Sequence, residues 1–189
     1  MIDTEEKYYT GKYDKAFKEI FLKESNKDLL KVLLEAILNV KIYDIKLEPT
    51  ERLSNHLKIK KKTFDCLLNT NEGLIGIEVN TSQPSYIHPR NFAYACDMYK
   101  SSTTIEDDYS EKINIIQINL SFGLPKKQER IRVYKMQDEK GNMFVKNFKI
   151  IEINMDLYNK KWYDLNRLEM TTEEKEKKFK FDNDRGRKR

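Results

Sequence analysis

The sequence predicts an α/β protein in which a mixed central sheet is flanked by helices. Apolar residues at helical spacing predict two consecutive helices near the amino terminus, over residues 14–22 and from residue 25 or 26 to 38. Two apolar runs on either side of a polar turn predict a β-hairpin over residues 58–80. A helix and an apolar strand follow the hairpin, so helices and strands are mixed along the chain.

Length and charge limit how the chain can be organised. With 189 residues we expect one domain over residues 1–172, consisting of a core at about 14–122 and a β-rich extension at 123–172. Residues 173–189 are rich in charge and are predicted to form a partly helical, then frayed tail. Charged residues make up 35% of the chain, with a formal net charge of +5. This balance permits a polyanionic partner without requiring one.

Several functional classes are excluded by what the sequence lacks. No apolar run approaches the ~18 residues that span a bilayer, and the amino terminus is acidic and polar, so we expect a cytoplasmic protein. Cys66 and Cys96 form no CxxC pair and are predicted to be reduced core thiols. The only histidines, His56 and His88, are accompanied by no GxSxG, P-loop or GxGxxG motif. Any chemistry must therefore rest on carboxylates, lysines or amides.

The first elements each have a local cause. Phe17, Ile20 and Phe21 repeat at helical spacing in the first segment. The second segment carries leucines and isoleucines on one side, and Ser25 or Asn26 is placed to cap it. The apolar residues Ile42, Ile45 and Leu47, followed by Pro49, predict a short strand.

The later elements follow two chain breaks at Pro84 and Pro89. Residues 90–101 carry apolar side chains at helical spacing, and a proline at the start of this segment suits the first turn of a helix. Residues 112–122 are rich in isoleucine and predict a buried strand. Residues 129–137 and 143–155, separated by a polar turn at 138–141, predict two further strands that extend the sheet.

Two acidic residues of the hairpin are candidates for chemistry. The strand at residues 74–80 is apolar except for Glu78 and Asn80, which alternation places on one face. If Asn71 and Glu72 form a two-residue turn, Asp65 lies opposite Glu78. A three-residue loop would instead offset the pair by one position.

Two facing carboxylates repel each other unless a cation lies between them. Oxygen ligands suit Mg²⁺ or Mn²⁺, and Mg²⁺ is commonly held by one or two carboxylates together with water and substrate phosphate. The alternative is that Glu78 pairs with a lysine from residues 58–62 and that Asp65 is a solvated strand residue.

The order of these elements, with Asp65 in KTFD and Glu78 in IEVN, resembles the PD-(D/E)XK nuclease superfamily. More narrowly, the chain resembles the PD-(D/E)XK nuclease family transposases, also called recombination-promoting nucleases. Further matching segments are DKAFK at 14–18, RNFAY at 90–94, Tyr99 and IQINL at 116–120. The resemblance covers roughly residues 14–122, and a weaker similarity to the family is present near residues 150–162.

This resemblance implies a restriction-endonuclease-like core of order ααβββαβ, in which Asp65 and Glu78 hold Mg²⁺ or Mn²⁺. It also implies DNA as the substrate and hydrolysis of a phosphodiester bond as the reaction, with the metal ion activating water. The third catalytic position of the motif is usually Lys, or Gln in this branch, and here it is Asn80. A carboxamide can position water or phosphate by hydrogen bonds but carries no charge.

Other residues have both a functional and a structural interpretation. Arg90 is a candidate contact for a DNA phosphate, with a bridge to Asp97 or to a core carbonyl as the alternative. In the basic run at 58–62, Lys61 clearly shares the side of Asp65 and is the second phosphate candidate. Tyr94 and Tyr99 are expected to pack in the core rather than stack on bases. Glu35 is expected to form a salt bridge on the helix surface, although it could also be an extra acid at the site.

Two functional hypotheses follow from these residues. The first is a Mg²⁺-dependent DNA endonuclease of mobile-element or recombination type, with Asp65, Glu78 and Asn80 as the catalytic residues. The second is a catalytically inactive nuclease fold that binds DNA or protein, which the asparagine and a shortened carboxy-terminal region favour. In either case self-association could supply elements that the short chain lacks. A purely structural protein would require the two carboxylates to lie apart or to be neutralised by lysines.

Overall fold

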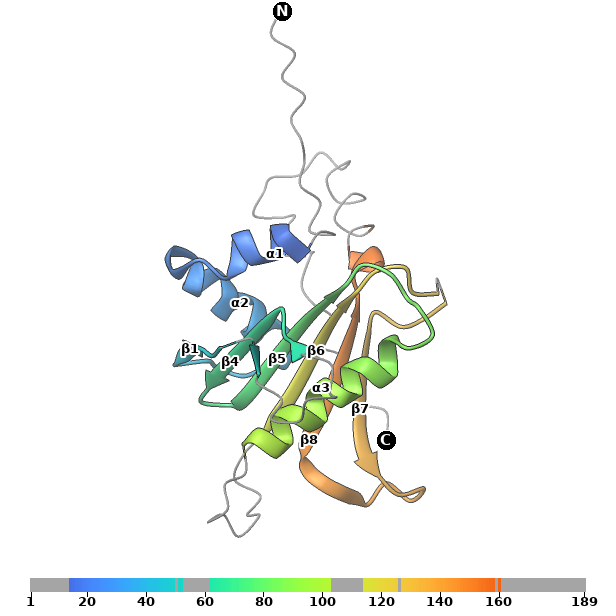
Figure 1. Ribbon diagram of the computed structural model, residues 1–189. Helices are drawn as coiled ribbons and strands as arrows, with labels where there is room; N and C mark the ends of the chain where they lie inside the picture. Colours follow the sequence, from blue (N-terminus) through green and yellow to red (C-terminus); the bar gives the residue numbers. More distant parts are fainter. Residues whose placement is uncertain are drawn as a thin grey trace, which may run out of the picture.

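The structure is a computed structural model that describes residues 14–49, 51–52, 62–102, 114–125, 127–158 and 160. Within these ranges a six-stranded mixed sheet lies between helices (Figure 1). The predicted fold class, a mixed α/β protein with a restriction-endonuclease-like arrangement, is therefore confirmed. The predicted tail at 173–189 and the start of the predicted hairpin lie outside the described residues.

The two amino-terminal helices form where the apolar spacing predicts them. They are α1 (Asp14–Phe21) and α2 (Lys27–Leu38), joined through the 3₁₀ turn η1 (Glu24–Asn26). Asn26 occupies the N-cap position of α2, but its side chain makes no cap hydrogen bond. Its amide instead donates to the carbonyl oxygen of Ile20 at 2.6 Å, which ties the turn back to α1.

The main sheet has the strand order β1-β4-β5-β6-β8-β7. Strands β5, β6 and β8 run parallel to one another, while β1, β4 and β7 pair antiparallel with their neighbours. A separate two-stranded sheet is formed by β2 (Glu51–Arg52) and β3 (Lys62–Thr63). The bounds of the six main strands are β1 (Ile45–Leu47), β4 (Cys66–Thr70), β5 (Gly73–Asn80), β6 (Ile115–Ser121), β7 (Ile131–Gln137) and β8 (Met143–Asn154).

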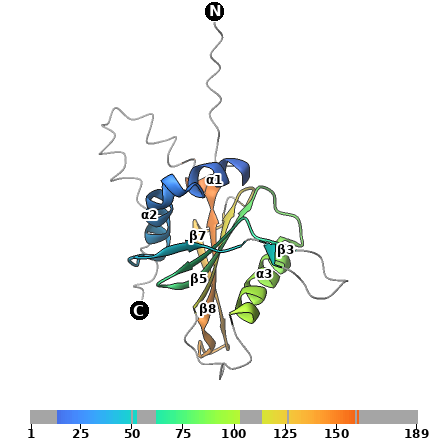
Figure 2. The same ribbon diagram turned by 60° about the vertical axis from the view of Figure 1, so that its left-hand side comes forward.

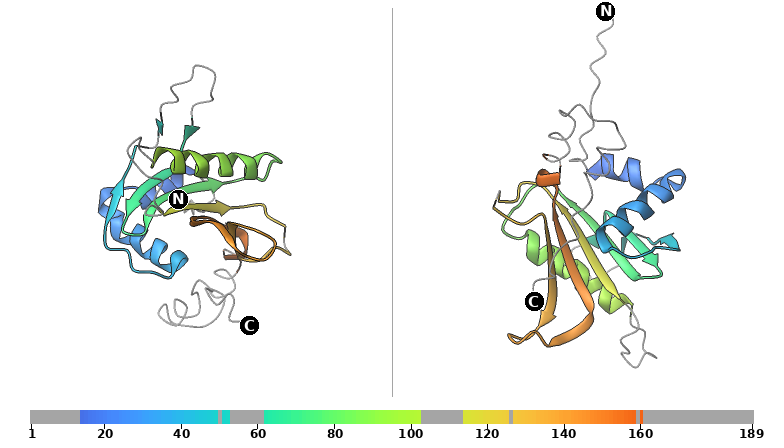
Figure 3. Two further views of the ribbon diagram at one scale, coloured as in Figure 1. Left: turned by 90° about the horizontal axis from the view of Figure 1, so that it is seen from below. Right: turned by 180° about the vertical axis from the view of Figure 1, so that it is seen from behind.

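The two faces of the sheet are covered by different helices. α1 and α2 lie over one face, and α3 (Ile87–Ser101) lies over the other (Figures 2 and 3). The face under α1 and α2 is apolar and forms the larger core cluster, which includes Ile77, Ile118 and Ile151 from three neighbouring strands. A smaller cluster under α3 includes Phe64 and Met98. The rest of the α3 face carries buried polar side chains.

The helix α3 begins earlier than the sequence indicates. It starts at Ile87 rather than at Arg90, so Pro89 is its third residue. Proline is tolerated there because the N–H groups of the first helical turn have no partner within the helix. The backbone N–H of Arg90 donates to the carbonyl oxygen of Tyr86 at 2.9 Å. This earlier start also places His88 in the first turn.

The predicted extension of the sheet is present as β7 and β8, which pair antiparallel across the turn at 138–141. β8 adds to β6 in parallel, with Asn119 opposite Glu152. The predicted strand at 42–47 is shorter than expected, because β1 covers only Ile45–Leu47. Among the described residues, no helix has the length and apolar character needed to cross a membrane.

Candidate active site

The hairpin of β4 and β5 has the register of a two-residue turn. Thr70 pairs with Gly73 across Asn71 and Glu72, and the ladder ends at the pair Cys66 and Ile77. Of the two registers that the sequence left open, the structure has the one with the two-residue turn, and it brings the next residues, Asp65 and Glu78, beside each other. Asp65 itself lies in a bend between β3 and β4 rather than inside a strand. The predicted single strand from residue 58 to 68 is therefore wrong at this point.

Backbone N–H groups donate hydrogen bonds to the two carboxylates and hold them side by side. At this bend these bonds take the place of the backbone hydrogen bonds that pair β4 with β5. The N–H of Asp65 donates to Glu78 Oε1 at 3.1 Å, and the N–H of Val79 donates to Asp65 Oδ2 at 2.8 Å. Each carboxylate thus uses one oxygen to fix its position. The other oxygens, Asp65 Oδ1 and Glu78 Oε2, are paired with side-chain cations.

The cations come from helices on opposite faces of the sheet. Lys18 of α1 places its Nζ atom 3.2 Å from Asp65 Oδ1. Arg90 of α3 places its Nη2 atom 3.6 Å from Glu78 Oε2. Lys18 was not singled out as a charge partner from the sequence, because only the fold brings α1 to the hairpin. The alternative partners for Glu78 at residues 58–61 lie outside the described part of the chain.

Glu78 is held in a setting that disfavours its charge. Burial raises the pKa of Glu78 to about 8, and the neighbouring charge of Asp65 adds to this effect. The hydrogen bond from Asp65 and the charges of Arg90 and Lys18 act in the opposite direction. Burial raises the pKa of the adjacent Cys66 thiol to about 12, so this thiol stays protonated.

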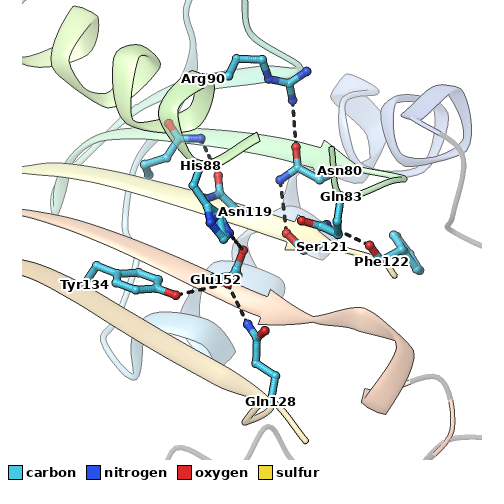
Figure 4. Close-up of polar contacts among 11 residues, drawn as sticks. Asn80, Gln83, His88, Arg90, Asn119, Ser121, Phe122, Gln128, Tyr134 and Glu152 are labelled. Carbon is cyan, nitrogen blue, oxygen red and sulfur yellow. Dashed lines mark hydrogen bonds and ion pairs between the residues drawn. The ribbon is translucent and has the colours of Figure 1, made fainter. Parts of the chain in front are cut away.

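Asn80 shares the face of Glu78 and is 2% exposed. Its Oδ1 atom accepts a hydrogen bond from Arg90 Nη2 at 2.8 Å, and its Nδ2 atom donates to Ser121 Oγ at 3.2 Å (Figure 4). The structure therefore brings Asp65, Glu78, Asn80 and Arg90 together at one place. These four residues are called the acidic centre below.

A sequence model of the PD-(D/E)XK nuclease family transposases matches residues 11–183. The chain belongs to this family. The match extends past the region in which the sequence resemblance was recognised and into the charged carboxy-terminal segment. No curated protein and no solved structure shows a significant match. Membership in this family of nucleases indicates a nuclease-type function.

The acidic centre of this family member fits a divalent metal ion in the chemistry of its donors. Mg²⁺ and Mn²⁺ prefer oxygen ligands, and Mg²⁺ is often held by one or two carboxylates with water completing its shell. Asp65 Oδ1 and Glu78 Oε2 supply such oxygens, and a bound cation would take over the charge compensation that Lys18 and Arg90 now provide. Within the described residues, no cluster of three His, Cys, Asp or Glu side chains is found.

Sequence reasoning overlooked a row of polar side chains on the neighbouring strands. The polar residues of β6 and β8 on the face of Glu78 are all buried; they are Gln117, Asn119, Ser121, Glu152 and Asn154. The signal was in the sequence, because polar residues alternate with apolar ones in both strands. The sequence analysis predicts a buried strand at 112–122 and a further strand at 143–155, and it assigns no role to the polar residues of either strand.

The remaining candidates have structural roles. Glu35 accepts the N–H of Ile42 at 3.1 Å and pairs with Lys41 at 3.3 Å, so it belongs to a surface salt bridge. Tyr94 packs against Phe64, and Tyr99 packs against Phe148, as expected for core aromatic residues.

Two predictions need separate comment. Lys61 lies outside the described residues. The prediction that both cysteines are core thiols is wrong for Cys96, which is exposed, whereas Cys66 is buried. Ala95 faces the core and Cys96 is the next residue, so Cys96 lies on the outer side of α3. The apolar spacing of this segment did not show which of the two residues is buried.

Proposed function

We propose that the chain is a Mg²⁺-dependent DNA endonuclease of the mobile-element or recombination-promoting type. The observation that carries this proposal is the paired geometry of Asp65 and Glu78. Each side chain is fixed by a backbone N–H through one oxygen, and each offers the other oxygen to a cation. A pair fixed in this way is preorganised for a hard divalent ion. DNA as the substrate and recombination as the setting are suggested by the transposase family.

The proposed reaction is hydrolysis of a phosphodiester bond. Asp65 and Glu78 would hold Mg²⁺ or Mn²⁺, which when bound lowers the pKa of a water molecule and stabilises charge on the phosphate. Asn80 would position water or a phosphate oxygen through its carboxamide. Arg90 would neutralise charge that develops on the phosphate, since its guanidinium offers several donors. Water attacks phosphorus, the bond from phosphorus to the leaving oxygen breaks, and that oxygen takes up a proton.

Lys61 is retained as a second proposed contact to a DNA phosphate, on the strength of the sequence pattern alone. A lysine near the scissile strand contributes mainly a point charge, which raises affinity without reading sequence. Its replacement by alanine should therefore weaken DNA binding about equally for different DNA sequences.

The test is cleavage of supercoiled plasmid by wild-type protein with Mg²⁺ or Mn²⁺, beside Asp65→Asn and Glu78→Gln. We expect the wild type to nick or linearise the plasmid and each variant to lose at least about a hundredfold in rate. Asp44→Asn is a matched control, because Asp44 is exposed and precedes β1 at the far edge of the sheet. The proposal fails if the two site variants cleave as fast as the control.

The second candidate function is a catalytically inactive nuclease fold that binds DNA or protein. Asn80 favours it, because the residue at this position cannot supply the charge of the usual lysine. In that case the wild type should bind DNA in a salt-dependent manner and cleave nothing with either metal ion. Cleavage that depends on both Asp65 and Glu78 would exclude this function.

A further inference from the structure

A second buried carboxylate lies on the polar face of the sheet, away from Asp65 and Glu78. Glu152 of β8 is 2% exposed. Its Oε1 atom lies 3.1 Å from His88 Nε2, and its Oε2 atom accepts hydrogen bonds from Gln128 Nε2 at 2.8 Å and from the Tyr134 hydroxyl at 3.4 Å (Figure 4). These donors come from α3, from the segment before β7 and from β7 itself.

The two partners of the Glu152–His88 pair differ sharply in exposure. The His88 side chain is 60% exposed, whereas the Glu152 side chain is 2% exposed. A buried carboxylate is costly unless it is paired and hydrogen-bonded. The pair therefore holds an exposed imidazole in one orientation through a contact with a buried carboxyl group. With Nε2 engaged, Nδ1 is the ring nitrogen that has no hydrogen-bond partner within the described part of the chain.

The Glu152–His88 pair and the acidic centre lie along one row of polar side chains that runs across β5, β6 and β8. Glu78, Asn119 and Glu152 are in register on three adjacent parallel strands, so Glu152 lies two strand spacings, or about 10 Å, from Glu78. Above this row, the first turn of α3 carries both His88 and Arg90. Arg90 reaches the Asn80 side of the row, and His88 reaches the Glu152 side (Figure 4).

The side of α3 that faces the sheet carries a buried amide, that of Asn91, which has no hydrogen-bond partner among the described residues. This is an observation independent of the Glu152–His88 pair. Asn91 is 1% exposed and lies next to Arg90, on the buried side of the helix with Ile87 and Ala95. Neither its amide nitrogen nor its amide oxygen has a hydrogen-bond partner among the described residues. Buried amides without any partner are rare in folded proteins, and bound water or a ligand usually satisfies them.

We propose that His88, held by Glu152, is a second contact for the phosphate backbone of the nucleic acid that the acidic centre acts on. This inference rests on the proposed function and extends it, because it assigns a binding role to residues outside the acidic centre. A protonated imidazole would donate from Nδ1 to a phosphate oxygen, while buried Glu152 balances its charge. The N-terminal end of α3 adds a favourable dipole for an anion.

A backbone contact explains why an arginine and a histidine, Arg90 and His88, flank the row. A nucleic acid strand presents phosphates at regular intervals, so a strand whose scissile phosphate lies at Glu78 has another phosphate within reach of a site about 10 Å away. The charged or titratable groups around the imidazole are Glu152 on β8, Tyr134 and Arg132 on β7, and Arg90 on α3. Of these residue types, histidine is the one that ordinarily changes charge between about pH 5 and 8.

The test is the affinity for a labelled DNA duplex, measured with a metal chelator present so that binding is separated from cleavage. At about pH 6, His88→Ala should weaken binding by about tenfold and reduce the slope of log Kd against log salt concentration by about 0.9, the loss of one phosphate contact. The comparison is repeated at about pH 8, where histidine side chains in general carry less positive charge, so the difference between the two proteins should be smaller there.

A double-mutant cycle distinguishes a contact from a structural role. Glu152→Gln keeps the shape of the side chain and removes its charge, so it should reproduce the loss at about pH 6. The double variant should lose no more than either single variant, because the two residues act as one unit. Lys46→Ala is the matched control for a lost positive charge, since Lys46 is exposed on β1 at the opposite edge of the sheet.

The possible results separate this contact from the proposed reaction. The inference is overturned if His88→Ala binds DNA like Lys46→Ala at both pH values and with the same salt slope, or if the wild type does not bind DNA. Since His88 is exposed, this variant is expected to fold even if Glu152→Gln does not. If the expected binding changes occur but no protein cleaves DNA, the contact stands and the endonuclease proposal fails.

Discussion

Arg90 and Asn80 form the contact that bears most directly on the proposed activity. The guanidinium of Arg90 lies 2.8 Å from Asn80 Oδ1 and 3.6 Å from Glu78 Oε2. In the motif that the chain resembles, the position of Asn80 usually carries lysine, so its charge would come from the same strand as the glutamate. In this chain the cation comes from α3, the helix that covers this face of the sheet, and its residue Arg90 reaches that position. We infer that Arg90 compensates for the missing ammonium group.

This compensation can be tested by changing Arg90. Arg90→Ala should lower the rate of plasmid cleavage by about a hundredfold, because one preorganised cation is lost at the phosphate. Arg90→Lys should restore only part of the rate, since an ammonium group is a point charge without the planar fork of arginine. The measurement is single-turnover cleavage at saturating protein, with Lys46→Ala as the control. Equal rates for wild type and Arg90→Ala would contradict the compensation.

At the scale of elements, the hairpin turn between β4 and β5 sets the geometry of the acidic centre. Asp65 and Glu78 meet only because Thr70 pairs with Gly73. Gly73 has φ +109°, and a Cβ atom at this residue would lie 2.2 Å from the carbonyl oxygen of Asn114. A side chain would thus be strained by the backbone conformation and would also clash with the segment that leads into β6. A one-residue shift would turn Glu78 to the apolar face.

Replacement of this glycine should therefore be costly. Gly73→Ala should lower the free energy of unfolding by about 2–4 kcal/mol, because it combines backbone strain with a clash against backbone. Gly141→Ala is a matched control, since Gly141 has φ +86° but no neighbouring atom within 4 Å of a Cβ. It should cost only about 1 kcal/mol. Urea unfolding measures the free energy of unfolding of both variants. Equal losses of stability would show that the segment at Asn114 moves aside and relieves the clash.

At the scale of the whole molecule, the buried acid links folding stability to pH. In the folded chain, burial is the main cause that raises the pKa of Glu78 from its ordinary value of about 4.5 to about 8. Between these values the folded state binds a proton that the unfolded state has released. Stability from this group is fully present below about pH 4.5 and is lost as pH rises through about 8. A divalent cation should reverse this loss, because it binds the charged carboxylate.

Glu78→Gln should remove this pH dependence. Without a divalent ion, the variant should be more stable than the wild type at about pH 8, by an amount on the order of a few kcal/mol, because no charge remains to be buried. Near pH 4.5 the two proteins should be similar. Added Mg²⁺ should stabilise the wild type at about pH 8 and leave the variant nearly unchanged. The measurement is urea unfolding across pH with a chelator. Parallel pH profiles for the two proteins would contradict the burial of a charge at Glu78.

Local patterns were enough to predict most of the elements and part of the site. Helical spacing located α1 and α2, and alternation in β5 placed Glu78 and Asn80 on one face. These features depend on neighbours within a few residues, so the sequence specifies them directly. The sequence left two registers open for the hairpin, and the structure selects the two-residue turn at Asn71 and Glu72, which brings Asp65 to Glu78.

The tertiary structure decided which distant residues join that hairpin. Lys18 reaches Asp65 from α1, Arg90 reaches Asn80 from α3, and Glu152 joins the same polar face from β8. None of these contacts follows from local pattern, because each depends on the order of strands and on which face a helix covers. The sequence by itself therefore determined most of the elements and named Asp65 and Glu78 as candidates. The packing of α1, α3 and β8 against the sheet determined the charges around that pair, because electrostatic partners are set by distance in space rather than by separation along the chain.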